Sequence, residues 1–284
     1  MPNQESGSSD SNHTATDREL ICPVCSGELS TDNQRAVCAK GHAFDRAREG
    51  YLNLLLANQK GSNDPGDDRE SIQSRHAFLE AGNYAFLADA IQEMLPRSDH
   101  PTMLDAGCGE GYFLRNLSVR HGYGVDISRS AIRLASKTSK SNTWIVANVA
   151  RQIPMADDSC NVLLSVVAPR NASEFSRVLR SDGLLVAVVP GSGHLQQLTS
   201  LLMERDAGQS AKPGVLIQSL APQFRSSNVH AVSKEFSAGK ETIGQLIAMT
   251  PLRWKSRKES LVDIVSLSSL KITASFQVHT FTPR

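Results

Sequence analysis

The chain has 284 residues, of which 40% are hydrophobic, and a formal net charge of +1 at pH 7. A chain of this length and apolar content can bury one large core and form a small additional module. The balanced charge excludes a strongly basic or acidic protein, so any attraction to nucleic acid has to come from local clusters. No segment approaches the roughly 20 apolar residues of a membrane span, which predicts a cytoplasmic protein without a membrane partner.

The N-terminal region divides into a polar tail and a segment that is rich in cysteine. Residues 1–18 are polar and have no apolar run, so they lack the core of a secretory signal, and we predict a disordered tail. Residues 19–58 contain three of the five cysteines. This distribution is typical of metal binding in a reducing compartment and not of a disulfide framework.

The cysteine-rich segment has the spacing of a metal site: Cys22-x2-Cys25-x12-Cys38-x3-His42. Two thiolates of a C-x-x-C pair converge from one tight turn, and the second pair completes a tetrahedron around zinc. Four protein ligands leave no open position, so the zinc would be structural and would fold a module that is too small to fold alone. A short hairpin is expected between the pairs. The alternative is a hairpin packed around reduced cysteines.

Residues 59–100 are interpreted as a linker loop followed by helices. Asp64 and Asp67 lie in a stretch of turn-forming and charged residues. Apolar residues then recur at helical spacing up to Leu95, with a break at Gly82-Asn83 that predicts two helices.

Residues 101–284 show the alternation of strands and helices of an α/β domain with a mostly parallel, doubly wound sheet. The expected strands lie at 103–104, 123–125, 144–146, 162–164 and 184–189. Residues 230–236 and 272–281 alternate like antiparallel strands and are expected at a C-terminal edge of the sheet.

A glycine-rich turn follows the first of these strands. Asp105 precedes glycines at 107, 109 and 111, a spacing that differs from the G-x-G-x-x-G of dinucleotide sites. The backbone of such a turn approaches a ligand closely, and an acid before it suits a ligand with an amino group. Asp126 ends the next strand, where a carboxylate can accept ribose hydroxyls. A tight turn without a ligand is the alternative.

With this turn and the acid of the second strand, the sequence resembles the class I methyltransferases, which bind S-adenosylmethionine there. The resemblance implies that Asn148, after the third strand, bonds the adenine. It narrows to the RlmA family of 23S rRNA guanine-N1 methyltransferases through the zinc motif and further matches, namely Phe44-Asp45-x3-Glu49-Gly50-Tyr51-x-Asn53-Leu54-Leu55, Asp64-Pro65-Gly66-Asp67, Arg75-x2-Phe78-Leu79-x-Ala81-Gly82-x-Tyr84, Ala168-Pro169, Pro190-Gly191-x2-His194-Leu195 and Met249-Thr250-Pro251-x2-Trp254. The matches cover the whole chain after the tail.

The resemblance implies a class I methyltransferase domain over residues 101–284, a small zinc-ribbon-like N-terminal domain, and methyl transfer to N1 of a guanine in a hairpin of domain II of 23S rRNA. It implies zinc on Cys22, Cys25, Cys38 and His42, a cofactor pocket lined by Tyr84, Gly111, Tyr112, Asp126 and His194, and it is compatible with a homodimer. The family has two branches that methylate neighbouring guanines. Asp64-Pro65-Gly66-Asp67 resembles one branch and Ala168-Pro169-Arg170-Asn171 the other, so the branch stays open.

Several residues also have simpler interpretations. Tyr84 and Tyr112 could only pack, and His194 could cap the helix that follows it. Neither Cys108 nor Cys160 has the setting of an activated nucleophile, and the absence of an Asp/Asn-Pro-Pro-aromatic turn after the fourth strand favours a ring nitrogen as methyl acceptor. Asp64 and Asp67 are candidate general bases or a solvated turn.

A basic cluster with neighbouring aromatic rings makes the zinc module a candidate RNA-binding surface: Lys40, Arg46, Arg48 and Lys60, with Phe44 and Tyr51. Two alternative functions remain, which are methylation of a small molecule and RNA binding without catalysis. The turn around Asp105 and Asp126 argues against the second.

Overall fold

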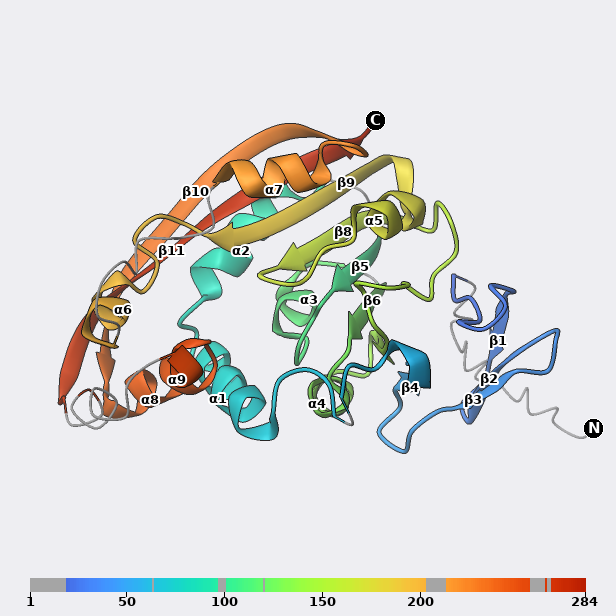
Figure 1. Cartoon of the computed structure of the whole chain (residues 1–284), viewed down its shortest axis with the longest axis horizontal. Coiled ribbons are helices and arrows are strands. Elements are labelled where there is room, and N and C mark those ends of the chain that lie inside the picture. Colours follow the sequence, from blue (N-terminus) through green and yellow to red (C-terminus); the bar gives the residue numbers. More distant parts are fainter. Residues whose placement is uncertain are drawn as a thin grey trace, which may run out of the picture.

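The computed structural model describes residues 19–284 except 63, 97–100, 120, 203–212, 256–263 and 265–266. The predicted tail, residues 1–18, lies outside the described residues. Figure 1 shows a small sheet beside a large, twisted sheet with helices around it. No helix in the described ranges has both the length and the apolar character needed to cross a membrane.

The small sheet carries the cysteine motif. Its three antiparallel strands are β1 (Leu29–Thr31), β2 (Arg35–Cys38) and β3 (Ala43–Asp45). The chain reverses between β1 and β2 where Asp32 Oδ1 accepts hydrogen bonds from the amides of Gln34 at 2.7 Å and Arg35 at 2.8 Å. Such an Asx turn directs the chain back without a long loop. The expected hairpin between the cysteine pairs is therefore confirmed.

The large sheet has eight strands. In spatial order they are β10 (Phe224–Gly239), β11 (Ser269–Pro283), β9 (Leu179–Pro190), β8 (Cys160–Val166), β5 (Thr102–Ala106), β6 (His121–Asp126), β7 (Thr143–Val146) and β4 (Leu52–Asn53). All neighbours from β9 to β4 are parallel, and β11 runs antiparallel to both β9 and β10. The predicted parallel strands and the antiparallel C-terminal edge are confirmed.

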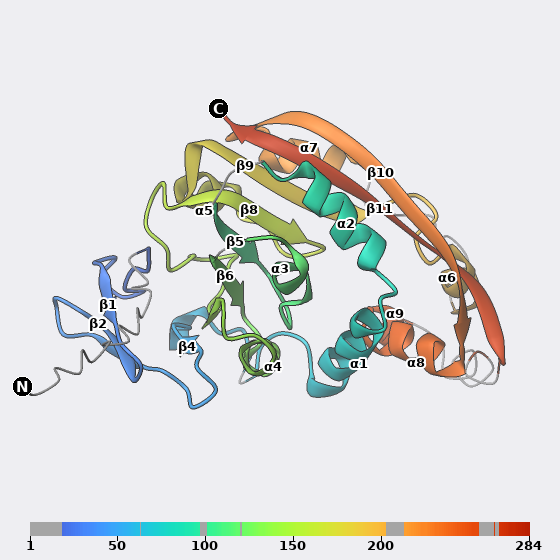
Figure 2. The ribbon, with the colours of Figure 1, turned by 180° about the vertical axis from the view of Figure 1, so that it is seen from behind.

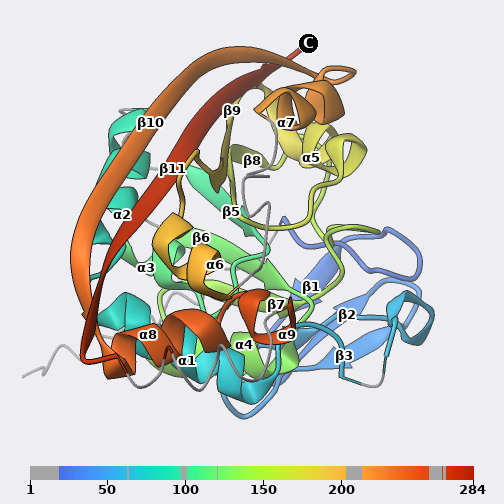
Figure 3. The ribbon, with the colours of Figure 1, turned by 60° about the vertical axis from the view of Figure 1, so that its left-hand side comes forward.

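Helices flank this sheet in the order α1 (Arg69–Glu80), α2 (Ala85–Met94), α3 (Tyr112–Asn116), α4 (Arg129–Thr138), α5 (Ala172–Val178), α6 (Gln196–Leu202), α7 (Pro213–Leu220), α8 (Lys240–Ala248) and α9 (Leu252–Lys255), and a 3-10 turn, η1, spans Ala57–Gln59. The predicted pair of helices with a break at Gly82-Asn83 is confirmed by α1 and α2. Figures 1 and 3 show α1, α8 and α9 side by side at one end of the sheet.

The sheet separates two hydrophobic cores. Side chains alternate along β5 and β8, so that Met103 and Val162 enter one core while Leu104 and Leu163 enter the other. This alternation is expected for strands buried on both faces. The second core also contains residues of the cysteine-rich segment, among them Leu20, and the small sheet is thereby packed onto the large one.

The cysteine-rich segment is attached to the large domain at both of its ends. At the first end, the amide of Ile21 donates to the carbonyl of Pro154 at 3.1 Å, and the amide of Ala156 donates to the carbonyl of Glu19 at 2.7 Å. At the other end, β4 pairs in parallel with Ile145 and Val146 of β7. Figure 2 shows β4 at the edge of the large sheet, on the side where the small sheet lies. The segment 19–58 thus contributes to both sheets.

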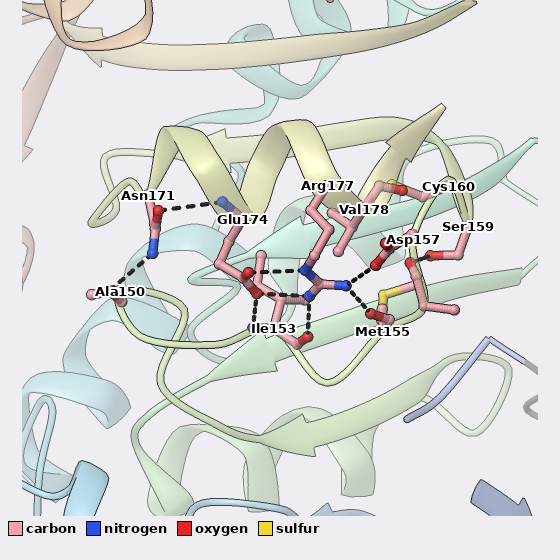
Figure 4. A network of polar contacts seen from close by, with 11 residues as sticks. Ala150, Ile153, Met155, Asp157, Ser159, Cys160, Asn171, Glu174, Arg177 and Val178 are labelled. Atoms are coloured by element: carbon pink, nitrogen blue, oxygen red, sulfur yellow. Dashed lines mark hydrogen bonds and ion pairs between the residues drawn. The ribbon is translucent and has the colours of Figure 1, made fainter. Parts of the chain in front are cut away.

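An arginine of α5 holds the loop that receives the first of these contacts (Figure 4). Arg177 donates to the carbonyls of Ile153 at 2.8 Å and Met155 at 2.6 Å, and its guanidinium forms two bonds with Glu174, at 2.9 and 2.7 Å. Glu174 in turn accepts the amide of Ile153 at 2.7 Å. A further bond of 2.9 Å reaches Asp157. The loop between β7 and β8 is therefore fixed by charge-assisted bonds.

Candidate functional site

The cysteine motif forms a compact cluster of four potential metal ligands. The ligand atoms of Cys22, Cys25, Cys38 and His42 lie within 4.8 Å of one another. The Sγ atoms of Cys25 and Cys38 are 3.7 Å apart, and His42 Nδ1 lies 3.5 Å from Cys22 Sγ and 3.3 Å from Cys38 Sγ. A tetrahedron with Zn–S bonds of about 2.3 Å and a Zn–N bond of about 2.0 Å has edges of roughly 3.5–3.8 Å. The donor set and its spacing therefore fit a closed, structural zinc ion.

Two tight turns present these ligands. In the first turn, the amide of Cys22 donates to the carbonyl of Gly27 at 2.7 Å, and the amide of Ser26 donates to the carbonyl of Cys22 at 2.8 Å. In the second, the amide of Cys38 donates to the carbonyl of His42 at 3.0 Å, and Gly41 has a φ of +82°. This left-handed conformation favours glycine. These two turns thus bring the two ligand pairs to one point.

A cavity of about 720 Å³ opens at the carboxyl ends of β5, β6, β8 and β9. This end of a parallel sheet is where ligands bind in open α/β folds. Its lining includes eight of the site residues that the sequence singled out, namely Asp67, Tyr84, Asp105, Gly107, Gly109, Tyr112, Asp126 and His194. The topology therefore brings segments more than a hundred residues apart to one site.

The glycine-rich turn leaves no room for side chains at two positions. Gly107 has a φ of +82°, and a Cβ atom there would lie 2.4 Å from the Cβ of Ala168. Gly111 has a φ of +81°, and a Cβ atom would lie 2.3 Å from Cη2 of Trp144. Only glycine satisfies both the conformation and the close approach. The turn is held by the amide of Gly107, which donates to the carbonyl of Val125 at 2.8 Å.

Two carboxyl groups of the cavity differ in their partners. Asp126 accepts the amide of Gly109 at 3.0 Å and the amide of Ser128 at 2.8 Å. Asp105 is 1% exposed, and its Oδ2 has no hydrogen-bond partner within the described part of the chain. Burial, and then the charges of Asp126 and Glu110, raise the pKa of Asp105 to about 8. A buried carboxyl oxygen without a partner is costly, and it fits the ammonium group of an amino-acid ligand.

Aromatic rings form one wall of the cavity. Tyr84 packs edge-on against Phe78 and Phe276, with ring centroids 4.8 and 5.0 Å apart, and His194 lies 4.5 Å from Phe276. His194 Nδ1 accepts the amide of Ser275 at 3.1 Å, so the neutral ring carries its proton on Nε2. Burial lowers the pKa of His194 to about 4, which keeps the ring neutral.

The structure shows the surroundings of the histidine, tyrosine and cysteine side chains that also had simpler interpretations. The Nδ1 atom of His194 accepts the amide of Ser275, so this side chain is tied to β11. Tyr84 and Tyr112 both pack in the core and also line the cavity. Cys160 donates to the carbonyl of Val178 at 3.3 Å, and burial raises the pKa of its thiol to about 12. Burial also raises the pKa of Cys108. Neither thiol is set up as a nucleophile.

Three predicted site residues lie outside the lining of the main cavity. Gly111 belongs to the glycine-rich turn but packs against the ring of Trp144. Asn148 donates from Nδ2 to the carbonyl of Gln59 at 3.0 Å and accepts the amide of Ala150 at 3.0 Å. Asp64 lines a separate, smaller pocket with Lys60 and Arg129. The structure thus separates Asp64 from Asp67.

Sequence reasoning assigned no role to Arg75, although it lies in one of the matched motifs. Its Nη2 forms an ion pair with Asp67 and donates to the carbonyl of Met249 at 3.4 Å. Arg75 therefore links α1, the loop that contains Asp67, and the end of α8 around the cavity. Glu110 was also missed: it is buried, accepts the amide of Tyr112 at 3.0 Å, and lies 3.7 Å from His76 Nδ1. The carbonyl of Met249 is 174 residues from Arg75, and His76 is 34 residues from Glu110, so no local pattern revealed these contacts.

Comparison with known proteins agrees with this architecture. Residues 20–63 match the family model described as RlmA, N-terminal, and residues 104–187 match the one described as Methyltransferase domain. The protein YxjB of Bacillus subtilis (strain 168), which carries the name of a 23S rRNA (guanine-N1)-methyltransferase, is 31% identical over 90% of this chain and 94% of its own length. The 23S rRNA (guanine(748)-N1)-methyltransferase of Streptomyces fradiae is 29% identical over 92% of this chain and 96% of its own.

Among solved structures, a chain of the complex between the Haloferax volcanii Trm112 methyltransferase activator and a methyltransferase superposes with a TM-score of 0.50. The match has 16% identity and covers 78% of this chain and all (100%) of the other. This likeness shows the fold. The class I methyltransferase fold, the methyltransferase activity with S-adenosylmethionine as cofactor, and the zinc module predicted from the sequence are thereby confirmed, and the chain belongs to the RlmA family of 23S rRNA (guanine-N1)-methyltransferases.

Proposed function

We propose that this enzyme transfers the methyl group of S-adenosylmethionine to N1 of a guanine in 23S rRNA. The identity of 31% with a relative named for this activity, over 90% of the chain, carries the proposal. The cavity supports it, because buried Asp105 with its unpartnered oxygen stands beside a turn that only glycine can form. S-adenosylmethionine supplies an activated methyl group on a sulfonium.

The proposed cofactor site uses residues of the cavity in distinct roles. Asp105 binds the ammonium group of the cofactor, because this is the ligand that its isolated carboxyl oxygen accepts best. Asp126 is rigidly held by two backbone amides and accepts the ribose hydroxyls. Tyr84, Tyr112 and His194 enclose the cofactor, and the Nε2 proton of His194 is available as a donor.

The guanine must be oriented and must lose its N1 proton during transfer. Orientation in a near-attack geometry contributes several kcal/mol, about 7–11 kcal/mol at most, and a general base contributes about 10²-fold to 10⁴-fold. Of the two candidate bases, Asp67 lines the cavity and Asp64 does not. Its ion pair with Arg75 holds Asp67 in position, and we assign the base role to Asp67.

The base assignment is tested by Asp67→Asn, with Asp182→Asn as a control at an exposed site of β9. We expect the rate of methyl transfer at saturating RNA and cofactor to fall about 100-fold or more for Asp67→Asn and to stay unchanged for the control. A fall of less than about 3-fold in the rate of methyl transfer, with an unchanged pH profile, would show that Asp67 is not the general base.

The zinc module is the proposed RNA-binding surface. Lys40, Arg48 and Lys60 are exposed, and cations of this kind bind phosphate groups. Arg46 is engaged within the module, because it donates to the carbonyls of Asp32 at 3.1 Å and Gly50 at 2.9 Å.

One aromatic residue of this surface requires a correction. The expectation that Tyr51 offers a flat surface to RNA was wrong: it is only 7% exposed and belongs to the main core. Phe44 is partly buried against the second core. The cationic side chains, and not these rings, therefore support the proposal for the module.

Charge reversal tests this surface directly. Lys40→Glu combined with Arg48→Glu should weaken RNA binding and reduce its salt dependence, whereas Lys234→Glu, an exposed change on β10, should do neither. An unchanged affinity and salt slope for the double variant would show that the RNA binds elsewhere. Cofactor binding is expected to be the same in all three proteins.

The first experiment is incubation of the purified chain with labelled S-adenosylmethionine and 23S rRNA that lacks its modifications, followed by mapping of the methylated nucleotide. A methyl group on N1 of a guanine in the domain II hairpin is expected, and its position identifies the branch; guanine 748 is the site in the name of the Streptomyces fradiae relative. Cofactor binding without incorporation into RNA would favour a small-molecule substrate. Lack of cofactor binding would favour a non-catalytic RNA-binding protein.

Two further properties belong to the proposal. A homodimer is compatible with the family and is tested by sedimentation of the full chain. Modification of rRNA takes place where ribosomes are assembled, which implies the cytoplasm, and fractionation of cells that produce the protein tests this location.

A further inference from the structure

One aromatic side chain at the cavity is largely exposed to water. Among the described residues, Trp254 is the most exposed large hydrophobic side chain, with an exposed fraction of 74%. It lies on α9 and lines the same cavity as Asp105. The second tryptophan, Trp144, is 2% exposed. An indole that remains open to water beside a ligand cavity gains hydrophobic stabilisation only when something covers it.

The position of this indole is fixed by the residues around it. Arg253 forms ion pairs with Asp68 at 3.0 Å and Glu70 at 2.8 Å, which tie α9 to the start of α1. Its guanidinium carbon lies 4.7 Å from the centroid of the Trp254 ring, a cation–π contact. Leu252 is buried at 7% exposure and anchors the same turn. The ring is therefore presented in a defined place, with a cation against it.

A second unusual residue faces the same cavity. Val167, at the carboxyl end of β8, is 56% exposed and has a φ of +51°. A β-branched residue in the left-handed region is a strained outlier, and such strain clusters at binding sites. The amide of Val167 donates to the carbonyl of Val188 at 3.0 Å, which holds the turn in this conformation. Two exposed apolar side chains thus belong to one opening.

The rim of this opening also contains polar groups. Asp67, Arg75 and Thr250 line the cavity together with Trp254. A purely apolar ligand would desolvate these groups without replacing their hydrogen bonds. A nucleobase has flat faces that stack on an indole and polar edges that bond to such groups, and base–aromatic stacking is the common mode for unstacked RNA bases.

We propose that Trp254 stacks on the target guanine when the guanine enters the cavity and is the residue that positions it. Arg253 lies against the indole and holds it for this contact. The assignment rests on the proposed function, because it takes the ligand to be an RNA base, and it adds a residue for which neither the family match nor the cofactor site gives a role.

The test compares Trp254→Ala with Trp254→Phe, with Val229→Ala as a matched control, since Val229 is an exposed apolar residue (45%) on β10. Methyl transfer to the 23S rRNA hairpin and binding of S-adenosylmethionine are measured for the full chain. We expect kcat/KM for RNA to fall about 5-fold to 150-fold in Trp254→Ala, which is the stacking free energy of one base expressed as a rate ratio. Trp254→Phe should recover most of this loss, and Val229→Ala should show none.

Cofactor affinity should be unchanged in all three variants, because Trp254 is assigned to the base. A Trp254→Ala enzyme with kcat/KM within 2-fold of the unaltered enzyme would overturn the inference while leaving the proposed function intact. If the unaltered enzyme fails to methylate RNA at all, it is the proposed function that fails.

Tryptophan fluorescence gives a readout that a purely structural role would not change. Because Trp144 is buried, an RNA titration should quench the emission of Trp254, and this quenching should be absent in Trp254→Phe. A hairpin with an abasic site in place of the target guanine should bind with little quenching. Full quenching by the abasic hairpin would overturn the assignment to the target base.

Discussion

Substitution of Arg177 by methionine should destabilise the enzyme and loosen the contact between the zinc module and the methyltransferase domain. Methionine keeps an apolar stem of similar length but leaves the carbonyls of Ile153 and Met155 and the carboxylate of Glu174 without their cationic donor. The ion pair with Asp157 adds little, since the Asp157 side chain is 75% exposed.

The expected magnitude follows from the two carbonyl contacts. A hydrogen bond from a charged donor contributes about 1.5–3 kcal/mol. The Arg177 side chain is 24% exposed, and part of each contribution is recovered by water. We therefore expect the free energy of unfolding to fall by about 2–4 kcal/mol, and the melting temperature by roughly 3–7 °C for a chain of this size.

The assay combines denaturant unfolding with amide hydrogen exchange. The amides of Ile21 and Ala156, which bond across the junction, should exchange faster in Arg177→Met, while amides of β5 keep their protection. Arg180→Met is the control, because its ion pair with Asp182 is long, at 3.5 Å, and exposed. A change in stability of less than about 0.5 kcal/mol for Arg177→Met, equal to that of the control, would refute the reasoning.

Three further predictions concern the metal, the glycine turn and the buried acid. Removal of zinc with a strong chelator, or Cys25→Ser, should abolish RNA methylation and preserve cofactor binding. Metal analysis of the untreated protein should find one zinc ion per chain. Methylation that survives loss of the metal would contradict a need for the folded zinc module. Gly107→Ala should weaken cofactor binding about 10-fold or more, because the new Cβ atom would overlap the Cβ of Ala168. Gly82→Ala is the control, since Gly82 has a similar φ of +77° but lies in open space. This control should lower the free energy of unfolding by about 1 kcal/mol and leave cofactor binding unchanged. Cofactor binding should release a proton, because the pKa of Asp105 is about 8 without a ligand and an ammonium partner lowers it. The affinity for the cofactor should therefore rise with pH up to about 8. Calorimetry at pH 7 in two buffers of different ionisation enthalpy detects the released proton, and Asp105→Asn should release none.

The same acid affects stability in the absence of the cofactor. The unfolded Asp105 titrates near 3.9 and the folded one near 8. Between these values the folded chain binds the extra proton, so stability is greatest below the lower pKa and falls as pH rises through the window. Asp105→Asn should flatten this dependence in denaturant unfolding measured from pH 5 to 8.

Local patterns sufficed to predict most of the fold. Buried strands such as β8 and the break at Gly82 could be predicted because apolar spacing and turn residues act within a few positions. The ligands Cys22 and His42 were predictable because zinc requires a short, characteristic spacing. Tyr84 and His194 of the aromatic wall were expected from the family resemblance, whereas Phe276, which packs against both, was not.

The features that escaped prediction depend on contacts between distant segments. β4 has two residues, too few for a recognisable period, and its pairing with β7 spans about ninety positions along the chain. The burial of Tyr51 results from this docking. Arg75 and Arg177 resemble any other surface arginine of a helix until the tertiary fold brings to them the carbonyls that they bind, those of Met249 and Ile153.

The double attachment of the cysteine-rich segment determines how the enzyme meets a large substrate. Ile21 is held at one end of the segment and β4 at the other, so the zinc module is joined to the methyltransferase domain at two separate points. RNA that binds both parts loses its own freedom but does not also have to order two domains, which lowers the entropic cost of association. On the proposal that the zinc module binds RNA, a hairpin fits only when the span from its contacted backbone to its reactive base equals the distance between the module and the cavity. Exchange of the module between relatives will succeed only if both attachments are transferred with it.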